Sequence, residues 1–406
     1  MRKRYRILFF AFIFIFIFIV FSSLVIREKQ KIIPVCAETT ISDEDMQRGK
    51  EELRESVEEL LKTLDTKALQ EYFDSLENFS DWNITDKIME LIDGGYLDYS
   101  DVFSALFSVF TSSIADMLPC FALICAIALL GGILNTVKSG FLQNSTAEII
   151  FFVSYAAISA VLLTQLVRVF ALCGNAMTDM RRQMEIILPM LLTLMSASGG
   201  TVSAAVYRPA AAFLSAGISN VFTEIIFPFT EIVIILNMVS NLNRNIKLQG
   251  FIALFQSANK WLIGLSVTVF GIFLSVQGLT AASYDGMSLR AAKYAISNSV
   301  PIVGGFISGG FDLILAGSTL IKNSVGIIGV FLLVSGVLTP VVTVVGFSLV
   351  LRLAAAACES IGDERVYSFL TKASDGIGYL VASLLSVAFL YFLTIVLLIC
   401  SAGVIF

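Results

Sequence analysis

Residues 325–351 read VGIIGVFLLVSGVLTPVVTVVGFSLVL and contain no charged side chain. This stretch is longer than the roughly 20 apolar residues that a helix needs to cross the hydrocarbon core of a bilayer. Further apolar stretches occur at 117–137, 149–172, 221–242, 261–279 and 377–406. The chain of 406 residues is 57% hydrophobic and 15% charged, whereas soluble proteins are about 25% charged. We therefore predict an all-α, multi-pass helical membrane protein.

The composition also excludes several classes of chemistry. The chain has no histidine, which removes histidine-based catalytic triads and histidine-ligated zinc or haem. The phosphate-binding pattern GxxxxGK[ST] and the hydrolase patterns GxSxG and HExxH are absent. The six cysteines form no CxxC pair, and we expect them to be small apolar groups in the helices. We predict no enzymatic activity, no cofactor, no bound metal and no nucleic-acid partner.

The N-terminal region, 1–37, has the features of an export signal. Basic residues in MRKRYR precede an apolar run at 7–26, and Val35-Cys36-Ala37 resembles a cleavage site with small residues. The apolar run is also long enough to remain as an uncleaved anchor. Both alternatives leave the basic end inside the cell and place residue 38 onward outside the cytoplasm.

The next region, 38–103, is acidic and is predicted to be helical and extracytoplasmic. Between Glu38 and Asp101 there are 19 acidic and 6 basic residues. Apolar side chains fall on one face of each of three successive helices: Leu53, Val57, Leu60, Leu61 and Leu64; Leu69, Tyr72, Phe73 and Leu76; Ile88, Met89, Leu91 and Ile92. A region this small makes a marginal core of its own, so we expect it to pack on the membrane domain or on a partner.

The membrane domain, 104–406, contains two interrupted apolar segments. The first, 186–220, is interrupted by Pro189, Gly199-Gly200 and Arg208-Pro209, and the second, 300–320, by Pro301 and Gly304-Gly305. Such segments are typical of helical hairpins or re-entrant elements shielded by protein. An arrangement in which both enter and leave on the outer side is consistent with a weak excess of basic residues in the inner loops. The matching sequences GGTVS at 199–203 and GGFIS at 304–308 suggest half-repeats at 181–279 and 290–406. Chance alignment of small residues is the alternative.

The apolar stretches also contain ionisable residues. Glu224 and Glu231 are seven residues apart and flank Pro228, so they share one helix face. Carboxylates at membrane depth are costly and usually face a bundle interior or a watery cavity. Three alternatives remain open for them: ion or substrate passage, pairing with Arg208 or another cation, and a position at the membrane interface. Asp312 and Arg208 nearly coincide under the proposed repeat and could form an ion pair.

One motif is more specific than the rest of the chain. Residues 293–305 read KYAISNSVPIVGG, and 306–329 read FISGGFDLILAGSTLIKNSVGIIG. Gly305 and Gly309 form a GxxxG pair that permits close helix contact. The motif residues are Lys293, Asn298, Pro301, Gly304, Gly305, Gly309, Asp312, Lys322 and Asn323. This order of residues, together with the export signal, acidic region and multi-span domain, resembles the stage III sporulation protein AE family of endospore-forming bacteria.

The resemblance implies a role without catalytic residues. It points to a membrane subunit of the complex encoded by the stage III A operon, in the mother-cell membrane around the forespore. The implied partners are the other stage III A proteins, stage II sporulation protein Q of the forespore, a YidC/Oxa-type insertase and membrane lipid. The complex would form a secretion-like channel required for late forespore gene expression under sigma factor G. The alternatives are a secondary transporter with a substrate site between the two repeats and a purely structural scaffold.

Overall fold

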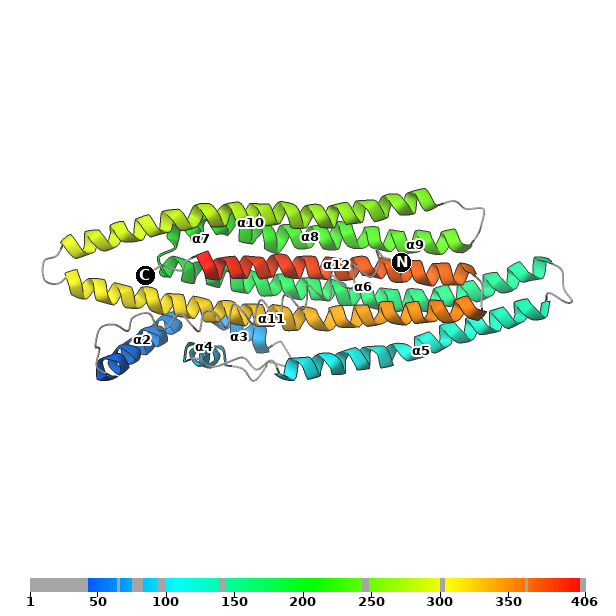
Figure 1. Cartoon of the computed structure of the whole chain (residues 1–406), viewed down its shortest axis with the longest axis horizontal. Helices are drawn as coiled ribbons and strands as arrows, with labels where there is room; N and C mark the ends of the chain where they lie inside the picture. Colours follow the sequence, from blue (N-terminus) through cyan, green and yellow to red (C-terminus); the bar gives the residue numbers. More distant parts are fainter. Residues whose placement is uncertain are drawn as a thin grey trace.

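The computed structural model describes residues 43–63, 66–74, 83–93, 100–138, 144–242, 248–299, 304–361 and 364–401 (Figure 1). All regular secondary structure in these ranges is helical. The elements are α2 (Asp43–Thr63), α3 (Lys67–Asp74), α4 (Ile84–Ile92), α5 (Ser100–Lys138), α6 (Asn144–Ala197), α7 (Thr201–Ala212), the π-helical segment η2 (Phe213–Ile218), α8 (Ser219–Val221), the π-helical segment η3 (Phe222–Ile226), α9 (Phe227–Leu242), α10 (Gln249–Ser299), α11 (Gly304–Ile361) and α12 (Glu364–Ser401).

Five helical stretches are long and apolar enough to cross a membrane. They are Phe152–Ala197, Thr201–Asn241, Gln249–Leu274, Leu313–Glu359 and Glu364–Ser401. This confirms the predicted all-α, multi-pass architecture. Helices α6 and α11 have 54 and 58 residues, which at 1.5 Å per residue makes each roughly 80 Å or more in length. Because the hydrocarbon core is only about 30 Å thick, both helices extend well beyond it.

The long helices lie side by side and run up and down one elongated bundle (Figure 1). Helices α11 and α12 form its centre, since 67% and 61% of their most apolar windows are buried by the rest of the protein. The corresponding window of α10 is only 17% buried. The apolar stretch at 325–351 therefore belongs to the best-packed helix of the described chain.

The first interrupted segment is a tight turn between two long helices. The chain reverses at Ser198–Gly200, where Gly199 has a φ of 90°. Residues with a side chain rarely adopt this conformation, because their Cβ would clash with the backbone. The expectation that Pro189 and Pro209 interrupt this segment is wrong, because they lie inside α6 and α7 without ending them. Four residues after Pro209 the backbone widens into η2, and η3 directly precedes α9, whose second residue is Pro228. Such local π-helical adjustments accommodate proline within membrane helices.

The second Gly-Gly pair lies at the beginning of a helix. Gly304 and Gly305 are the first residues of α11, while 300–303, including Pro301, lie outside the described residues. The start of α11, the turn at Ser198–Gly200 and the end of α12 all lie at the same end of the bundle (Figure 1). Of the bounds of the proposed half-repeats, 181–279 and 290–406, residue 181 falls inside α6 and residues 279 and 290 fall inside α10, and the duplication stays a prediction.

The acidic N-terminal helices pack against the side of the bundle. Val57 and Leu61 of α2, Leu69, Tyr72 and Phe73 of α3, and Ile88 of α4 are buried, as their spacing in the sequence indicated. The side chain of Asn83 caps α4 by accepting hydrogen bonds from the backbone N–H of Thr85 and Asp86. A methyl group at Gly317 of α11 would lie 3.2 Å from Leu60 Cδ1, so the absence of a side chain there lets α2 approach α11 closely.

Candidate functional site: polar contacts between the membrane helices

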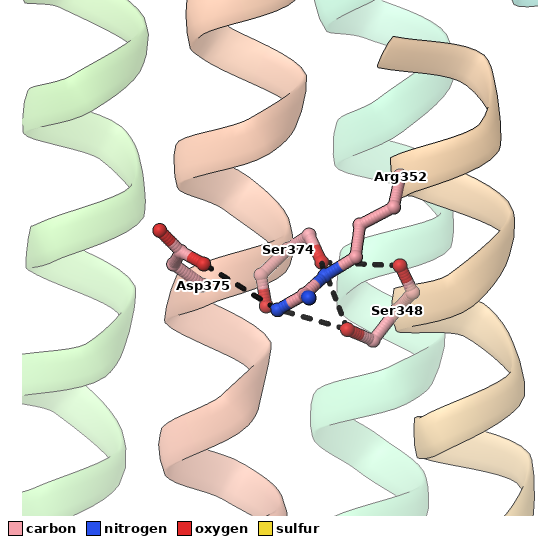
Figure 2. Close-up of polar contacts among 4 residues, drawn as sticks. All are labelled: Ser348, Arg352, Ser374 and Asp375. Atoms are coloured by element: carbon pink, nitrogen blue, oxygen red, sulfur yellow. Dashed lines mark hydrogen bonds and ion pairs between the residues drawn. The ribbon is translucent and has the colours of Figure 1, made fainter. Parts of the chain in front are cut away.

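A group of four polar residues joins the two central helices. Arg352 of α11 donates from Nε to Ser374 Oγ of α12 at 3.0 Å, and its Nη2 lies 3.5 Å from Asp375 Oδ1. Ser348 Oγ and Ser374 Oγ are 2.8 Å apart. Figure 2 shows the guanidinium between the serine and aspartate side chains. We call Ser348, Arg352, Ser374 and Asp375 the Arg352 cluster.

The Arg352 cluster neutralises a charge between the C-terminal part of α11 and the N-terminal part of α12. The side chains of Arg352 and Asp375 are 36% and 25% exposed, so both are partly removed from water. The Asp375 carboxylate and the Ser374 hydroxyl accept hydrogen bonds from the guanidinium of Arg352, which would be costly to bury without partners. The arrangement orients α11 against α12 and contains no pair of groups set up for nucleophilic or acid–base catalysis.

A motif lysine makes a second contact between the same helices. The side chain of Lys322 is fully buried, and its Nζ donates a hydrogen bond to the backbone carbonyl of Ile399 at 3.1 Å. Ile399 lies in the last turn of α12, where carbonyl groups have no N–H partner within the helix. A cation at a helix C-terminus is also favoured by the helix dipole. Lys322 thus caps the end of α12 from inside the bundle.

Close glycine contacts surround this lysine. A methyl group at Gly326 would lie 2.3 Å from Ile399 Cδ1, and one at Gly329 would lie 3.1 Å from Ile187. The carbonyl oxygen of Gly329 accepts a hydrogen bond of 2.8 Å from Gln183 Nε2 of α6, which is buried. Small residues and buried polar side chains are typical of contacts between membrane helices, so 322–329 is a packing site for α6 and α12.

Three further polar contacts join neighbouring helices. Ser219 Oγ and Tyr391 Oη lie 2.6 Å apart and connect α8 to α12. Asn259 Nδ2 of α10 donates to Thr230 Oγ1 of α9 at 2.9 Å. Tyr155 Oη of α6 donates to the carbonyl of Met238 at 2.6 Å. The buried polar groups therefore fix the register of the bundle.

The predicted ionisable residues do not form a buried site. Arg208, Glu224 and Glu231 are all exposed on the outside of the bundle. Among the described residues no ion pair connects Arg208 to either glutamate. The side chain of Asp312 lies outside the described residues, so its predicted pairing with Arg208 stays a prediction.

The family-motif residues divide into two groups. Lys322 is buried as described above, and Asn323 is partly buried next to it. Lys293 and Asn298 lie in the last turns of α10, and Gly304, Gly305, Gly309 and Asp312 lie in the first turns of α11, but the side-chain environments of these positions lie outside the description. The proposed GxxxG contact at Gly305 and Gly309 therefore stays a prediction.

Sequence reasoning did not identify Gln183, Tyr391 or the Arg352 cluster. Their partners are 146, 172 and 22 to 23 residues away in the chain, so no local spacing connects them. The only indication of these residues in the sequence was that polar side chains lie beside or within apolar stretches. Within the described residues no group of three or more cysteine, aspartate or glutamate side chains is placed to hold a metal ion, and Cys120, Cys125, Cys173, Cys358 and Cys400 are free thiols.

Comparison with known proteins identifies the same family as the sequence motif that contains Lys322. The sequence profile of stage III sporulation protein AE matches residues 82–403, most of the chain. The chain belongs to the stage III sporulation protein AE family. It is 28% identical to the stage III sporulation protein AE of Bacillus subtilis (strain 168) over 267 residues, which cover 66% of this chain and 67% of the relative. No solved structure shows a significant match to the chain.

Membership assigns the chain to a family of sporulation proteins that is not a known enzyme family. Together with the five candidate spans, it makes the chain a sporulation membrane protein. The matched region includes the motif, both Gly-Gly pairs and both members of the Lys322–Ile399 contact.

Proposed function

We propose that this chain is a non-enzymatic, multi-pass subunit of the channel complex between mother cell and forespore, required for late forespore sigma factor G activity. Family membership over residues 82–403 carries the proposal. The described polar contacts support a structural rather than catalytic role, because in each of them a polar side chain of one helix donates a hydrogen bond to another helix.

The proposed partners are the other stage III A-operon proteins, stage II sporulation protein Q and a YidC/Oxa-type insertase, within the mother-cell membrane. In this proposal 1–37 directs export or anchors the chain, and 38–103 faces the space between the two membranes. The N-terminal helices pack along α11 and α6, which would hold this acidic region next to the membrane domain, within reach of a forespore protein.

A complementation experiment in a sporulating host tests the proposal. The host's own stage III AE gene would be replaced by this chain, and a sigma factor G reporter, spore yield and co-purification with stage III A proteins would be measured. We expect reporter activity with the intact chain and its loss with Gly326→Leu, because that substitution would force α11 and α12 apart. Gly336→Leu is the control, since a methyl group at Gly336 meets nothing within 4 Å. Normal reporter activity without any stage III AE protein would overturn the proposal.

A transporter function receives less support from the positions of Glu224 and Glu231. A substrate site between two halves of the bundle would require inward-facing carboxylates, whereas both are exposed on its surface. Glu224→Gln/Glu231→Gln distinguishes the two functions. A transporter should lose solute flux in vesicles while the complex still assembles, and a channel subunit should show no intrinsic solute flux in either form.

A further inference from the structure

The outward side of α6 carries a single stripe of exposed side chains. Its positions recur every three or four residues, which keeps them on one side of an α-helix. The first part of the stripe consists of Ile149, Val153, Ala156, Ala160, Thr164 and Val167. Past Ala171 the same stripe continues with Asn175, Thr178, Arg182, Glu185, Pro189 and Thr193. We call the first set the apolar part and the second set the polar part of the α6 stripe.

The two parts differ in chemistry although they belong to one side of one helix. None of the positions in the apolar part is charged, and the hydroxyl of Thr164 donates to the carbonyl of Ala160 within the helix. Between 168 and 197 every residue is described, and no large apolar side chain is exposed. The polar part nevertheless lies entirely within the candidate span Phe152–Ala197. The medium outside α6 therefore changes just after Val167.

The surroundings of the polar part require water. The guanidinium carbon of Arg182 lies 5.8 Å from the ring centre of Tyr72 in α3, and Glu71 beside this tyrosine is exposed. Glu185 pairs with Arg181 at 2.8 Å, and the two side chains stay 47% and 40% exposed. Exposed carboxylates are costly to place in lipid. Hydrocarbon is therefore a poor neighbour for α6 at this level, whatever the length of its apolar sequence.

A different side of the bundle is suited to lipid. The exposed side chains of α10 include Leu254, Trp261, Leu265, Val269, Ile272 and Phe273. They belong to the candidate span Gln249–Leu274, in which Lys260 is the only charged residue. Only 17% of the most apolar window of this span is buried. Aliphatic and aromatic side chains with so little protein cover are suited to contact with lipid chains.

Contacts through α9 put these two surfaces at the same level along the bundle. The ring centres of Phe170 in α6 and Phe227 in α9 are 6.4 Å apart. Thr230, three residues after Phe227, accepts a hydrogen bond of 2.9 Å from Asn259 of α10. From these contacts α6 and α10 run toward the same end of the bundle (Figure 1). At 1.5 Å per residue, Leu265–Phe273 of α10 therefore lies level with the polar part of the α6 stripe to within roughly two helical turns.

We propose that the polar part of the α6 stripe faces water and lines the aqueous path of the complex, at a level where α10 faces lipid. One wet side and one lipid-facing side at the same level are what a subunit in the wall of a channel requires. The apolar part, from Ile149 to Val167, is roughly 27 Å long, close to the roughly 30 Å of a hydrocarbon core, so lipid contacts α6 there. The lining of the path rests on the proposed function, whereas the assignment of water and lipid to the two sides does not.

Single cysteines in a cysteine-free, full-length chain in lipid vesicles test the two surfaces. Asn175→Cys and Thr178→Cys probe the polar part, and Val269→Cys and Ile272→Cys probe α10 at the same level; all four native side chains are exposed. Val153→Cys, in the apolar part of the same stripe, is the matched control. The first measurement is the rate of modification by a membrane-impermeant maleimide present on both sides of the vesicle membrane. The second is the quenching of a thiol-attached fluorophore by nitroxide-labelled lipid chains.

We expect the two cysteines of the polar part to react at least about tenfold faster than the other three, because the reactive thiolate forms only in contact with water. The other three should be quenched by the lipid nitroxide. Slow reaction with lipid quenching at Asn175→Cys and Thr178→Cys would overturn the proposal. Fast reaction at Val269→Cys and Ile272→Cys would also overturn it, because this whole level of the bundle would then stand outside the membrane. Thermal unfolding identifies any variant that does not fold, and the second variant of the pair then carries the test.

The assembled complex tests the lining of the aqueous path separately. In a complex co-purified with stage III A proteins, Asn175→Cys and Thr178→Cys should remain reactive toward the maleimide. Their protection on assembly would show that another subunit covers the polar part, and would overturn the lining while the water and lipid assignment stood. Failure of the channel role itself would appear instead in the sigma factor G reporter, which none of these labelling results determines.

Discussion

The Nζ of Lys322 in α11 lies 3.1 Å from the carbonyl oxygen of Ile399 in the last turn of α12. A lysine near the beginning of one candidate span thereby caps the C-terminus of the next helix. This contact also explains why the motif lysine tolerates complete burial, because its charge is directed at the negative end of a helix dipole. The two central helices are held in register by this contact at one end and by the Arg352 cluster at the other.

Lys322→Met should destabilise the purified protein by about 1–3 kcal/mol, because the Ile399 carbonyl then loses a buried donor. Hydrogen exchange should quicken selectively in the last turn of α12, near Ile399. Lys260→Met is the matched control, since Lys260 is exposed on α10. Unchanged exchange at the end of α12 would show that the cap does not hold this turn.

Gly326→Ala should lower the thermal stability by about 1–3 kcal/mol, as overpacking of a close contact does. The added methyl group would lie 2.3 Å from Ile399 Cδ1 and 2.4 Å from Ile399 Cγ1. Gly336→Ala in the same helix meets nothing within 4 Å and should be neutral or stabilising by up to about 1 kcal/mol, because alanine favours helix. The shortened side chain in Ile399→Ala should partly restore the stability of Gly326→Ala. If both alanine variants were equally stable, the close packing at Gly326 would be refuted.

Arg352→Gln and Asp375→Asn should each destabilise the protein, and the double variant should cost less than the sum of the two. A double-mutant cycle on thermal or denaturant unfolding should give a coupling of roughly 0.6–1.7 kcal/mol, as for other polar contacts between membrane helices. Additive effects would indicate that the pair in Figure 2 contributes nothing to stability.

Tyr72 should make the docking of the N-terminal helices sensitive to alkaline pH. Burial, together with the negative charge of Asp179 and against the opposing effect of Arg182, raises the pKa of Tyr72 to about 12. The phenol in the unfolded chain ionises near pH 10, so the folded state binds more protons than the unfolded state between pH 10 and 12. Stability should therefore be complete below pH 10 and fall by up to roughly 2–3 kcal/mol as the pH rises to 12.

Absorbance at 295 nm and thermal unfolding at pH 9 and 11 measure this effect. The difference in absorbance between the wild type and Tyr72→Phe should titrate near pH 12, and the variant should lack this part of the stability loss. A difference titration with its midpoint at pH 10 would show that Tyr72 is solvated.

The sequence predicted the helices better than the contacts between them. Periodicity located the apolar faces of α2, α3 and α4, and the Gly199-Gly200 pair located a chain reversal because φ at Gly199 is positive. Pro189 and Pro209 were misjudged as interruptions, since both lie within continuous helix, and π-helical backbone follows only Pro209. Lys322 was identified from its motif, but its partner in α12 could not be, because helix packing alone brings residues 77 apart in sequence into contact.

The most direct test of the account is a cysteine-accessibility map of the intact chain in sealed membrane vesicles, with single cysteines at Gly304, in α2 and at Ala197 and Thr201, which are exposed on either side of the turn. The structure places the turn at Ser198–Gly200 and the start of α11 at one end of the bundle (Figure 1). We predict that a membrane-impermeant thiol reagent labels these positions and α2 from the same, extracytoplasmic side. Labelling of Thr201 and Gly304 from opposite sides would contradict the helix arrangement, and with it the proposed channel subunit.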